Sequence, residues 1–424
     1  MIKPVRYSEN NKNDILKRTS GSTADYEEGV KKIISDVRSR GDEALKEYTI
    51  KFDGVKLDDL RVSPQEFDEA EGIVGSDYKA MLQRATENIA TFHRAQLRQG
   101  FEIKGNGFIL GQKVTPLESA GLYVPGGKAA YPSTVLMNAV PAKIAGVNRI
   151  VMVTPPLQNG KIKPEVLVAA KIAGVSEVYK VGGAQAIAAL AYGTESIKKV
   201  NKITGPGNIY VAAAKKLVYG DCGIDMIAGP SEILIIADGD ADAENVAADL
   251  LSQAEHDELA TAVLITNSMD LAQNVCAALE NRLKNLARRA IAQASIKNNC
   301  KVIVTDDLER AVQLSDELAP EHLELAVKEP FELLKKVRNA GSVFLGYNTP
   351  EPVGDYYAGP NHTLPTGGTA KFSSPLGVED FIKTTQYIYY TREKLRESAD
   401  DIVMFANSEG LTAHAQSVSV RIEK

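Results

Sequence analysis

Apolar and polar residues follow two different periods along the chain. Short, almost wholly apolar runs, such as 149–153 and 232–237, are typical of buried strands. Between such runs, apolar residues recur at spacings of three and four over about ten or more positions, which indicates helices. Strands and helices follow one another in turn. This order predicts parallel strands joined by crossover helices, the pattern of a doubly wound sheet.

From residue 119 onward the pattern predicts two such series. The first has strands at 119–124, 149–153, 177–181 and 200–203 and helices at 133–145, 164–173, 184–192 and 209–218. The second has strands at 232–237, 262–266, 302–305 and 342–345 and helices at 241–256, 270–286 and 308–315. We therefore expect an α/β protein with two doubly wound sheet domains. Ligands are expected in the cleft between them, at the carboxyl ends of the strands.

The two ends of the chain carry weaker patterns. Residues 1–22 are polar and predict an arm that docks on a larger body. Two helical blocks follow at 24–48, with a break at Gly41, and at 65–97, and alternation around Gly105 and Gly107 predicts a hairpin.

The last part of the chain loses its regular pattern. Residues 346–381 are rich in Gly, Pro and small polar residues and predict a long loop. A helical tail ending in a strand at 417–422 comes last. Because the tail is too short to bury a core of its own, we expect it to dock on this chain or on a second copy.

Length and composition limit the classes of protein to consider. With 424 residues the chain exceeds one ordinary core, and 44% apolar with 25% charged residues is typical of a globular protein. A formal net charge of −6 argues against a basic surface, so nucleic acid is not an expected partner. Neither a run of roughly 20 apolar residues nor a signal-peptide core is present. We expect a cytoplasmic protein with no membrane partner.

Histidine is scarce, and its placement is informative. Of five histidines, His93 lies at the edge of a helical stripe and is interpreted as structural. The other four lie beside acids or amides where regular structure ends: His256 with Gln253 and Glu255, His322 with Glu321, His362 with Asn361 and Asp355, and His414 with Glu409. Imidazole and carboxylate groups in such sets can bind a metal ion or move protons.

Each of these sets also has a structural alternative. Gln253 and His256 share a helix face and can bind a metal ion or a polar substrate, or else simply cap the helix end. Glu321 and His322 follow Pro320 and can form a proton-handling pair, or else a turn that opens a strand. Asp355 follows Gly354 and can be a zinc ligand or a plain turn residue.

Glycine-rich turns follow three of the predicted strands. They are Pro125–Gly127, Gly182–Gln185 and Gly205–Asn208, each ahead of a helix. Backbone amides at a helix start can receive pyrophosphate, although none of the turns has the Gly-x-Gly-x-x-Gly spacing. Tight turns in a wound sheet explain them equally well.

Taken together, these motifs resemble the histidinol dehydrogenase family. The matching segments are Gly121–Gly127, Val181–Ala191, Gly205–Asn208, Gly229–Glu232, Leu251–His256, Pro320–His322, Gly354–Thr366 and Leu411–His414. The resemblance implies two NAD-dependent oxidations that convert L-histidinol through L-histidinaldehyde into L-histidine. It also implies incomplete Rossmann-like sheet domains.

The resemblance further implies site residues. Zinc would be held by Gln253, His256, Asp355 and His414, and protons would be handled by Glu321 and His322. NAD would contact Tyr123, Gln185 and Asn208. Histidinol would contact Ser231, Gln253, His256, His322, Asp355, Glu409 and His414, with His362 nearby.

The family is a homodimer, which gives the tail a docking partner. The implied division is an arm at 1–22, a discontinuous first domain at 23–118 and 235–376, a second domain with the NAD contacts at 119–234 and a dimerisation tail at 377–424. His414 would then complete the site of the other subunit.

Other functions stay open at this point. A zinc hydrolase could use the same His, Asp and Glu residues to activate water. A dehydrogenase of another amino alcohol would carry similar motifs, and a two-domain solute-binding protein would close on a ligand without turnover. A thiohemiacetal route to the acid is not expected, because Cys222, Cys276 and Cys300 lie outside all of these clusters.

Overall fold

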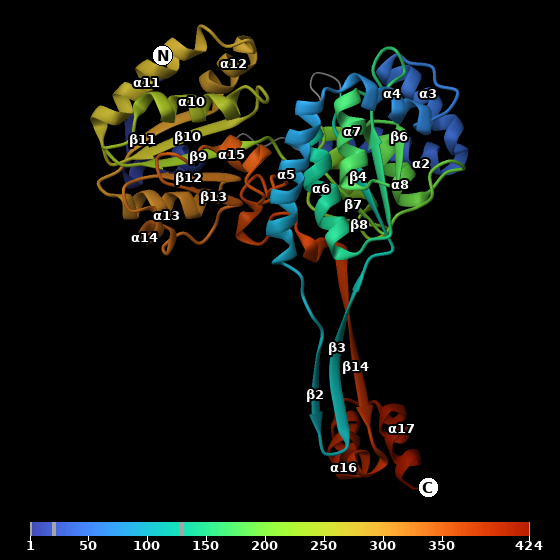
Figure 1. Cartoon of the computed structure of the whole chain (residues 1–424). Helices are drawn as coiled ribbons and strands as arrows, with labels where there is room; N and C mark the ends of the chain where they lie inside the picture. The colour runs from blue at the N-terminus through green and yellow to red at the C-terminus, as the bar shows by residue number, and fades with distance from the viewer. Residues whose placement is uncertain (1, 19–22, 127–130, 424) are drawn as a thin grey trace. The chain divides into compact units, whose positions relative to one another are not determined.

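Three sheets organise the residues that the computed structural model describes, namely 2–18, 23–126 and 131–423 (Figure 1). Residues 19–22 of the predicted arm and Gly127 of a glycine-rich turn lie outside these ranges. The chain divides into a first unit, Met1–Gln96 with Glu118–Phe381, and a second unit, Leu97–Leu117 with Ile382–Lys424. Two parallel sheets belong to the first unit, which confirms the expected α/β class with parallel strands.

The larger sheet of the first unit has six strands, all parallel to their neighbours. In spatial order they are β1 (Val5–Arg6), β11 (Cys300–Val304), β10 (Thr261–Thr266), β9 (Glu232–Ala237), β12 (His322–Ala326) and β13 (Ser342–Leu345). Part of the predicted arm is thus an edge strand, β1. Successive side chains of a strand point to opposite faces. Accordingly, Ile233 and Ile235 belong to one core and Leu234 and Ile236 to another.

Helices cover both faces of this sheet. One core contains residues of α10 (Ala243–Ala254), α11 (Met269–Leu283) and α12 (Arg289–Asn299). The other contains residues of α1 (Lys12–Leu16), α13 (Leu308–Leu318) and α14 (Pro330–Leu334). The predicted strand 232–237 coincides with β9 and the predicted strand 342–345 with β13, whereas α12 was not predicted.

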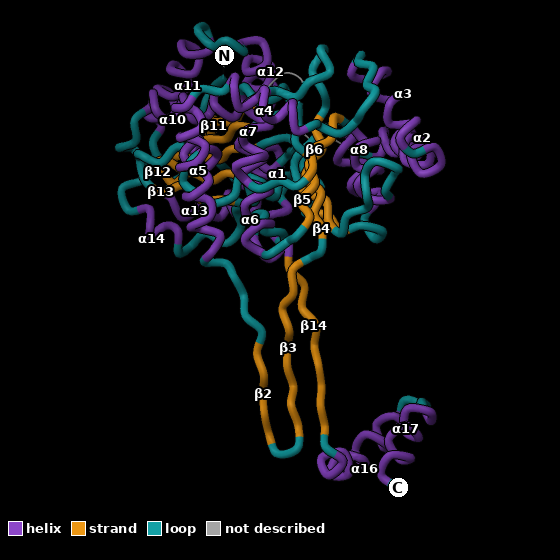
Figure 2. Tube along the Cα trace, turned by 45° about the vertical axis from the view of Figure 1, so that its right-hand side comes forward, coloured by secondary structure: helices purple, strands orange, loops and turns teal. Residues whose placement is uncertain are grey.

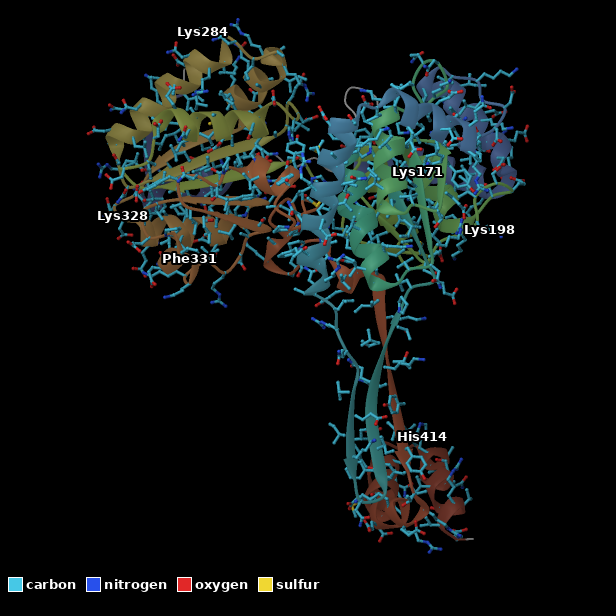
Figure 3. All side chains as sticks on the ribbon, in the orientation of Figure 1. Lys171, Lys198, Lys284, Lys328, Phe331 and His414 are labelled. Carbon is cyan, nitrogen blue, oxygen red and sulfur yellow. The ribbon has the colours of Figure 1, made fainter. Side chains whose placement is uncertain are left out.

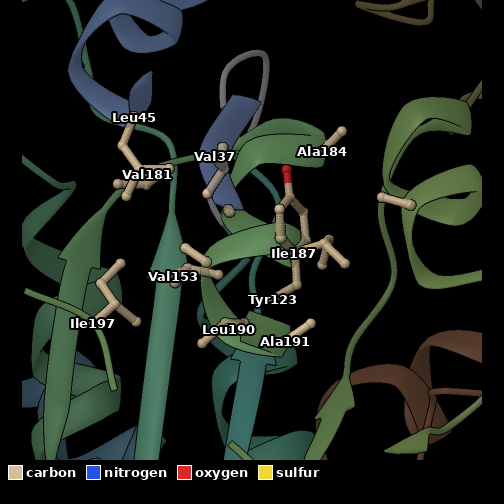
Figure 4. Packing of buried hydrophobic residues seen from close by; sticks show 14 of the residues in the cluster. Val37, Leu45, Tyr123, Val153, Val181, Ala184, Ile187, Leu190, Ala191 and Ile197 are labelled. Atoms are coloured by element: carbon tan, nitrogen blue, oxygen red, sulfur yellow. The ribbon is translucent and has the colours of Figure 1, made fainter. Parts of the chain in front are cut away.

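The smaller sheet of the first unit has five parallel strands. In spatial order they are β6 (Glu177–Lys180), β5 (Arg149–Thr154), β4 (Ser119–Tyr123), β7 (Lys202–Thr204) and β8 (Gly223–Ile224). A core cluster on one face joins these strands to α8 (Gly183–Tyr192), α9 (Ile209–Val218), α2 (Ala24–Arg40) and α3 (Asp42–Asp53) (Figure 4).

Four further helices accompany the five-stranded sheet. Helix α6 (Pro132–Ala145) packs on β4 and β5, and α7 (Pro164–Ala173) packs beside α6. Helix α5 (Ser76–Arg94) contacts both α6 and α7, and α4 (Pro64–Ile73) contacts α7. The predicted block 65–97 is therefore two helices, separated at Gly75.

These contacts bear on the predicted domain division, which stays a prediction. Val30, Val37 and Leu45 share a core with Tyr123 and Val153, although the division grouped 23–118 with the other sheet (Figure 4). Helices between 24 and 94 therefore pack with the five-stranded sheet's own helices, α6 to α9.

The second unit is a three-stranded antiparallel sheet followed by two helices. Its strands, in spatial order, are β14 (Ile382–Tyr390), β3 (Phe108–Pro116) and β2 (Phe101–Gly105), and they run side by side (Figure 2). The predicted hairpin is confirmed: its turn lies between β2 and β3, where Gly107 has a φ of 76° that favours glycine.

Two predictions for the tail are wrong. Residues 382–390 form strand β14 instead of a helix, because a segment rich in Thr, Ile and Tyr, which favour strands, pairs with the open edge of β3. Residues 417–422 belong to helix α17 (Thr412–Ile422) instead of a strand. There α17 packs on α16 (Arg392–Ser408), and the small buried side chains Ala399 and Ala415 permit close packing of two helices.

The predicted loop 346–381 contains short helical segments. They are α15 (Glu351–Tyr356) and the 3-10 turns Thr369–Lys371 and Val378–Phe381; a third 3-10 turn, Glu9–Asn11, precedes α1. Among the described residues, no helix combines the length and apolar character needed to cross a membrane.

Candidate active site

The predicted pair Glu321–His322 lies where α13 turns into β12. The turn includes Ala319, whose φ of 47° is in the left-handed region that costs a side-chain-bearing residue free energy. His322 is the first residue of β12, and both side chains of the pair are buried. The structural alternative, a turn that opens a strand, therefore describes the backbone correctly and does not exclude a role for the two side chains.

The backbone of Glu232 orients both members of the pair. Its N–H donates to Oε2 of Glu321 at 2.8 Å, and Nδ1 of His322 lies 3.0 Å from its carbonyl oxygen. A carbonyl oxygen only accepts, so Nδ1 carries a proton and Nε2 is the ring atom left to react. The Glu232 side chain pairs with Arg18 of the N-terminal segment.

Two carboxylates face Nε2 of His322. Asp355 Oδ1 lies 3.7 Å and Glu351 Oε1 lies 3.9 Å from this atom. Both acids stand on α15, four residues apart, and residues at that spacing share a helix face. Glu351 is held by its N–H to Glu324 Oε1 at 2.8 Å and by the Ser252 hydroxyl at 2.9 Å.

Burial and mutual charge shift the proton affinities of this cluster. Burial raises the pKa of Glu321 to about 8 and that of Glu351 to about 7. Burial lowers the pKa of His322, but the carboxylates of Glu321, Asp355 and Glu351 outweigh it and raise the pKa to about 10. Burial opposes the ionisation of Asp355, yet the polar contact of its carboxylate with His322 at 3.7 Å and the charge of His362 lower its pKa to about 2. Asp355 is thus the member of this cluster that stays ionised most readily.

Gln253 and His256 lie at the end of α10, with Nε2 of Gln253 3.5 Å from Nδ1 of His256. Oε1 of Gln253 is buried and accepts no hydrogen bond from any residue that the structure describes. Burial lowers the pKa of His256, and the charges of Asp355 and His322 act on it as well. A neutral imidazole and a free amide oxygen are suitable ligands for zinc.

His362 also joins this group. Its Nδ1 lies 3.0 Å from the carbonyl oxygen of Asp355, and its Nε2 lies 3.4 Å from the Thr134 hydroxyl of α6. The charges of Asp355, His322 and His256 all act on its pKa, which burial lowers. Three of the four histidines singled out in the sequence therefore lie around Asp355.

The remaining predicted residues lie in other places. Ser231, partly exposed, precedes β9, and its carbonyl accepts from the Thr261 N–H at 3.0 Å. Glu409 and His414 are exposed residues of the second unit. Glu409 ends α16, and His414 lies on α17 (Figure 3). His93 is fully buried, with its Nδ1 2.7 Å from Oε1 of Gln96, in keeping with a structural role.

One group of described side chains could hold a metal ion. His322, Glu351 and Asp355 present ligand atoms that all lie within 4.8 Å of one another. This set shares Asp355 with the expected set of Gln253, His256, Asp355 and His414. Nε2 of His322, like Oε1 of Gln253, is buried without a hydrogen-bond partner among the described residues. The Gln253 oxygen, a buried acceptor, fits a positively charged group.

The three expected NAD residues lie at the carboxyl ends of strands in the five-stranded sheet. Tyr123 ends β4, Gln185 lies in the first turn of α8 beyond β6, and Asn208 caps α9 beyond β7. The Tyr123 hydroxyl accepts from the Gly183 N–H at 3.1 Å. Oε1 of Gln185 is another buried acceptor without a partner in the described part of the chain. The polar side chains of Tyr123, Gln185 and Asn208 at these turns are suited to binding a polar cofactor.

The expected site residues lie at both ends of the strands. The residues expected to contact NAD lie at carboxyl ends, where ligands bind in wound sheets. Glu321 and His322, by contrast, lie at the amino end of β12, and Glu232 lies at the amino end of β9. The turn at Pro320, which precedes β12, places this pair, whereas the carboxyl end of a strand does not.

Glu232 and Glu351 are site residues that the sequence analysis missed. Glu232 stood at the head of an apolar strand, and Glu351 stood between two prolines in a predicted loop. A signal existed for Glu351: a proline-initiated turn with acids four residues apart predicts both carboxylates on one helical face.

Comparisons with known proteins agree with one another. A family model described as histidinol dehydrogenase matches residues 16–422. Histidinol dehydrogenase of Bacillus cereus is 55% identical over 396 residues, 93% of this chain and 92% of that protein. That of Geobacillus kaustophilus is 54% identical over 411 residues, 96% of this chain and 97% of that protein. The crystal structure of histidinol dehydrogenase from Elizabethkingia anophelis matches with a TM-score of 0.95 at 38% identity, covering 100% of this chain and 98% of that one.

Proposed function

The chain belongs to the histidinol dehydrogenase family, and from this premise we propose that it oxidises L-histidinol through L-histidinaldehyde to L-histidine, with NAD and zinc. The observation that carries the proposal is the buried pair Glu321–His322 beside Asp355, within a chain matched by the family from residue 16 to 422.

The proposed zinc ligands are Gln253, His256, Asp355 and His414. Support comes from the unpartnered buried oxygen of Gln253 among the described residues, the lowered pKa of His256 and the ionised Asp355. Zinc bound there supplies positive charge that orients the nitrogens of the substrate and opposes the pull of the carboxylates on the His322 proton.

The reaction sets the tasks of the side chains. The first oxidation removes a hydride and the hydroxyl proton, and the aldehyde must add water before a second hydride can leave. The sum consumes one histidinol, one water and two NAD, and releases the acid anion, two NADH and three protons. NAD accepts the hydride in both steps.

Proton transfer falls to Glu321 and His322. His322 accepts the hydroxyl proton at Nε2, while its Nδ1–H donates to Glu232 and keeps the ring in place. In the second step Glu321 and His322 together accept a proton from the attacking water. Both groups are buried, so bulk water does not compete for the reactive aldehyde.

The remaining contacts follow the family pattern. Histidinol would contact Ser231, Gln253, His256, His322, Asp355, Glu409 and His414, with His362 beside them. NAD would contact Tyr123, Gln185 and Asn208. The cytoplasmic location expected from the sequence remains a prediction.

We further propose a homodimer in which residues 377–424 dock on the partner and His414 completes the partner's site. The second unit exposes large apolar side chains, among them Ile388, Met404 and Phe405, at 76%, 69% and 70%. Exposed apolar surface of this kind marks interaction sites.

The proposal is tested by NADH formation. Purified protein with histidinol and NAD is expected to form two NADH per histidinol. A chelator should abolish turnover and added zinc should restore it. Failure to form NADH from histidinol by the zinc-loaded protein would overturn the proposal, and turnover of another amino alcohol alone would redirect it.

A further inference from the structure

We propose that the buried ion pair Lys215–Asp225 is a positioning device for the turn Gly205–Asn208 and thereby sets the affinity for NAD. The inference rests on the proposed function, because it takes Tyr123, Gln185 and Asn208 as NAD contacts. Neither Lys215 nor Asp225 is among the residues that the family motifs implied.

The two side chains hold both backbone groups of a single residue. Nζ of Lys215 donates to the carbonyl of Gly205 at 3.0 Å, and the N–H of Gly205 donates to Oδ2 of Asp225 at 2.8 Å. The two side chains also pair with each other and are only 2% and 1% exposed. Gly205 is thus bound on both sides by one ion pair.

Asp225 is itself held in place. Its backbone N–H donates to the Ile203 carbonyl at 3.1 Å, and its Oδ1 accepts from the Met226 N–H at 2.6 Å. Lys215 stands on α9, the helix that Asn208 caps through bonds from the N–H groups of Tyr210 and Val211. The pair therefore connects the end of β7, the turn and the helix into one rigid arrangement.

The turn lies directly against the backbone of Tyr123, another of the expected NAD residues. Gly205 has a φ of 108°, and a Cβ on it would lie 2.1 Å from the carbonyl oxygen of Tyr123. Tyr123 in turn accepts from the N–H of Gly183, two residues before Gln185. A shift of Gly205 would consequently displace Tyr123 and Asn208, and through Tyr123 the turn that carries Gln185.

Stability alone does not call for a charged pair in this place. Removing two charges from water is costly, and apolar residues of similar volume often serve as well. Holding the N–H and the carbonyl of one glycine, however, needs an acceptor and a donor together. Since sub-ångström placement of binding groups controls affinity, the pair is best explained by the geometry of the turn.

The test compares two double variants with the wild type. Lys215→Met/Asp225→Leu removes both bonds to Gly205, whereas Lys215→Met/Asp225→Asn keeps an acceptor for its N–H. Binding of NADH is followed by its own fluorescence, since the chain has no tryptophan. We expect the KM for NAD and the Kd for NADH to rise about tenfold or more in the first variant and less in the second. The KM for histidinol, the zinc content and the kcat should change by less than about threefold.

A matched control is the pair Arg149–Glu177, which lies at the amino ends of β5 and β6 in the same sheet. Arg149→Met/Glu177→Gln should leave the Kd for NADH unchanged. Unaltered NADH binding in a folded Lys215→Met/Asp225→Leu protein overturns the inference. If that variant does not fold, unaltered binding by Lys215→Met/Asp225→Asn overturns it. Wild-type protein that neither binds NADH nor uses NAD contradicts the proposed function instead.

Discussion

At the scale of single residues, the surroundings of a side chain decide its proton affinity and hence its task. A carboxylate lies near each ring nitrogen of His322: Glu321 is 3.7 Å from Nδ1, and Asp355 is 3.7 Å from Nε2. His256 is exposed and His362 is half-buried, fewer carboxylates act on them, and desolvation lowers their pKa values. In the proposed site one residue type would thus serve in two ways, as a proton-handling group at His322 and as a neutral zinc ligand at His256.

The two possible ligand sets make different predictions for zinc. If Gln253, His256, Asp355 and His414 hold the metal, His256→Ala should lose zinc and turnover together. His322→Ala should keep zinc and lose turnover by about a hundredfold or more. Metal analysis beside NADH formation measures both. Loss of zinc from His322→Ala with zinc retained in His256→Ala would favour the set of His322, Glu351 and Asp355.

The raised pKa of Asp53 predicts that the free energy of unfolding depends on pH. Burial raises the pKa of Asp53 to about 6, and its Oδ2 has no hydrogen-bond partner among the described residues. Its position at the end of α3 also opposes the negative charge. A folded pKa above the unfolded value of about 3.9 means that stability is fully present below about pH 4 and is lost as the pH rises through about 6.

Asp53→Asn removes this loss. We expect the variant to melt roughly 1–3 °C higher than the wild type at pH 7.5, a small effect because solvent screens the partly exposed charge. The difference should vanish near pH 4. Calorimetric melts at both values are the measurement, and an equal difference at both would rule out titration of Asp53 as its cause.

At the scale of elements, α15 is the part whose placement matters most for the site. This short helix carries Glu351 and Asp355, and it packs tightly against β13. A Cβ on Gly354 would lie 2.6 Å from Cε1 of Phe344, a buried ring next to His322. Packed interiors transmit such displacements instead of absorbing them.

Gly354→Ala is accordingly expected to push α15 away from β13. Overpacking should lower the free energy of unfolding by about 1–3 kcal/mol, and the displaced Asp355 should lower kcat/KM about tenfold or more. The control is Gly29→Ala on α2, where no described atom other than the nearby backbone of the same helix lies within 4 Å of the added methyl group. That variant should be as active as the wild type and slightly more stable. Similar activity of both variants would show that α15 tolerates the shift.

At the scale of the whole molecule, the proposed site needs residues from both units of the chain. Gln253, His256 and Asp355 belong to the first unit, and Glu409 and His414 to the second. In a twofold dimer each tail would serve the other subunit, so neither copy would be complete alone.

Mixing of inactive variants tests this arrangement. His322→Ala and His414→Ala should each be inactive as purified proteins. After the two are unfolded and refolded together, half of the dimers should be mixed, and each mixed dimer has one intact site. About one quarter of the wild-type activity is then expected. No recovery in dimers shown to be mixed would mean that His414 acts in its own subunit.

The sequence by itself determined most of the elements of the two parallel sheets and the identity of the chemistry. Apolar periodicity is a local property of the chain, so α7, α9, β9 and β13 could be predicted to the residue. The residues of the Glu321–His322 pair could also be named in advance, because their types restrict the chemistry they can do.

Tertiary structure alone decided the rest. Residues 382–390 and 417–422 have patterns compatible with strand or helix, and only pairing with β3 and packing on α16 selected one. Glu351 lies beside His322 only because α15 packs near β12. Glu232 can orient His322 only because the fold brings its backbone next to a residue 90 positions further along the chain. Contacts between distant segments depend on how the elements pack, and no local spacing encodes that packing.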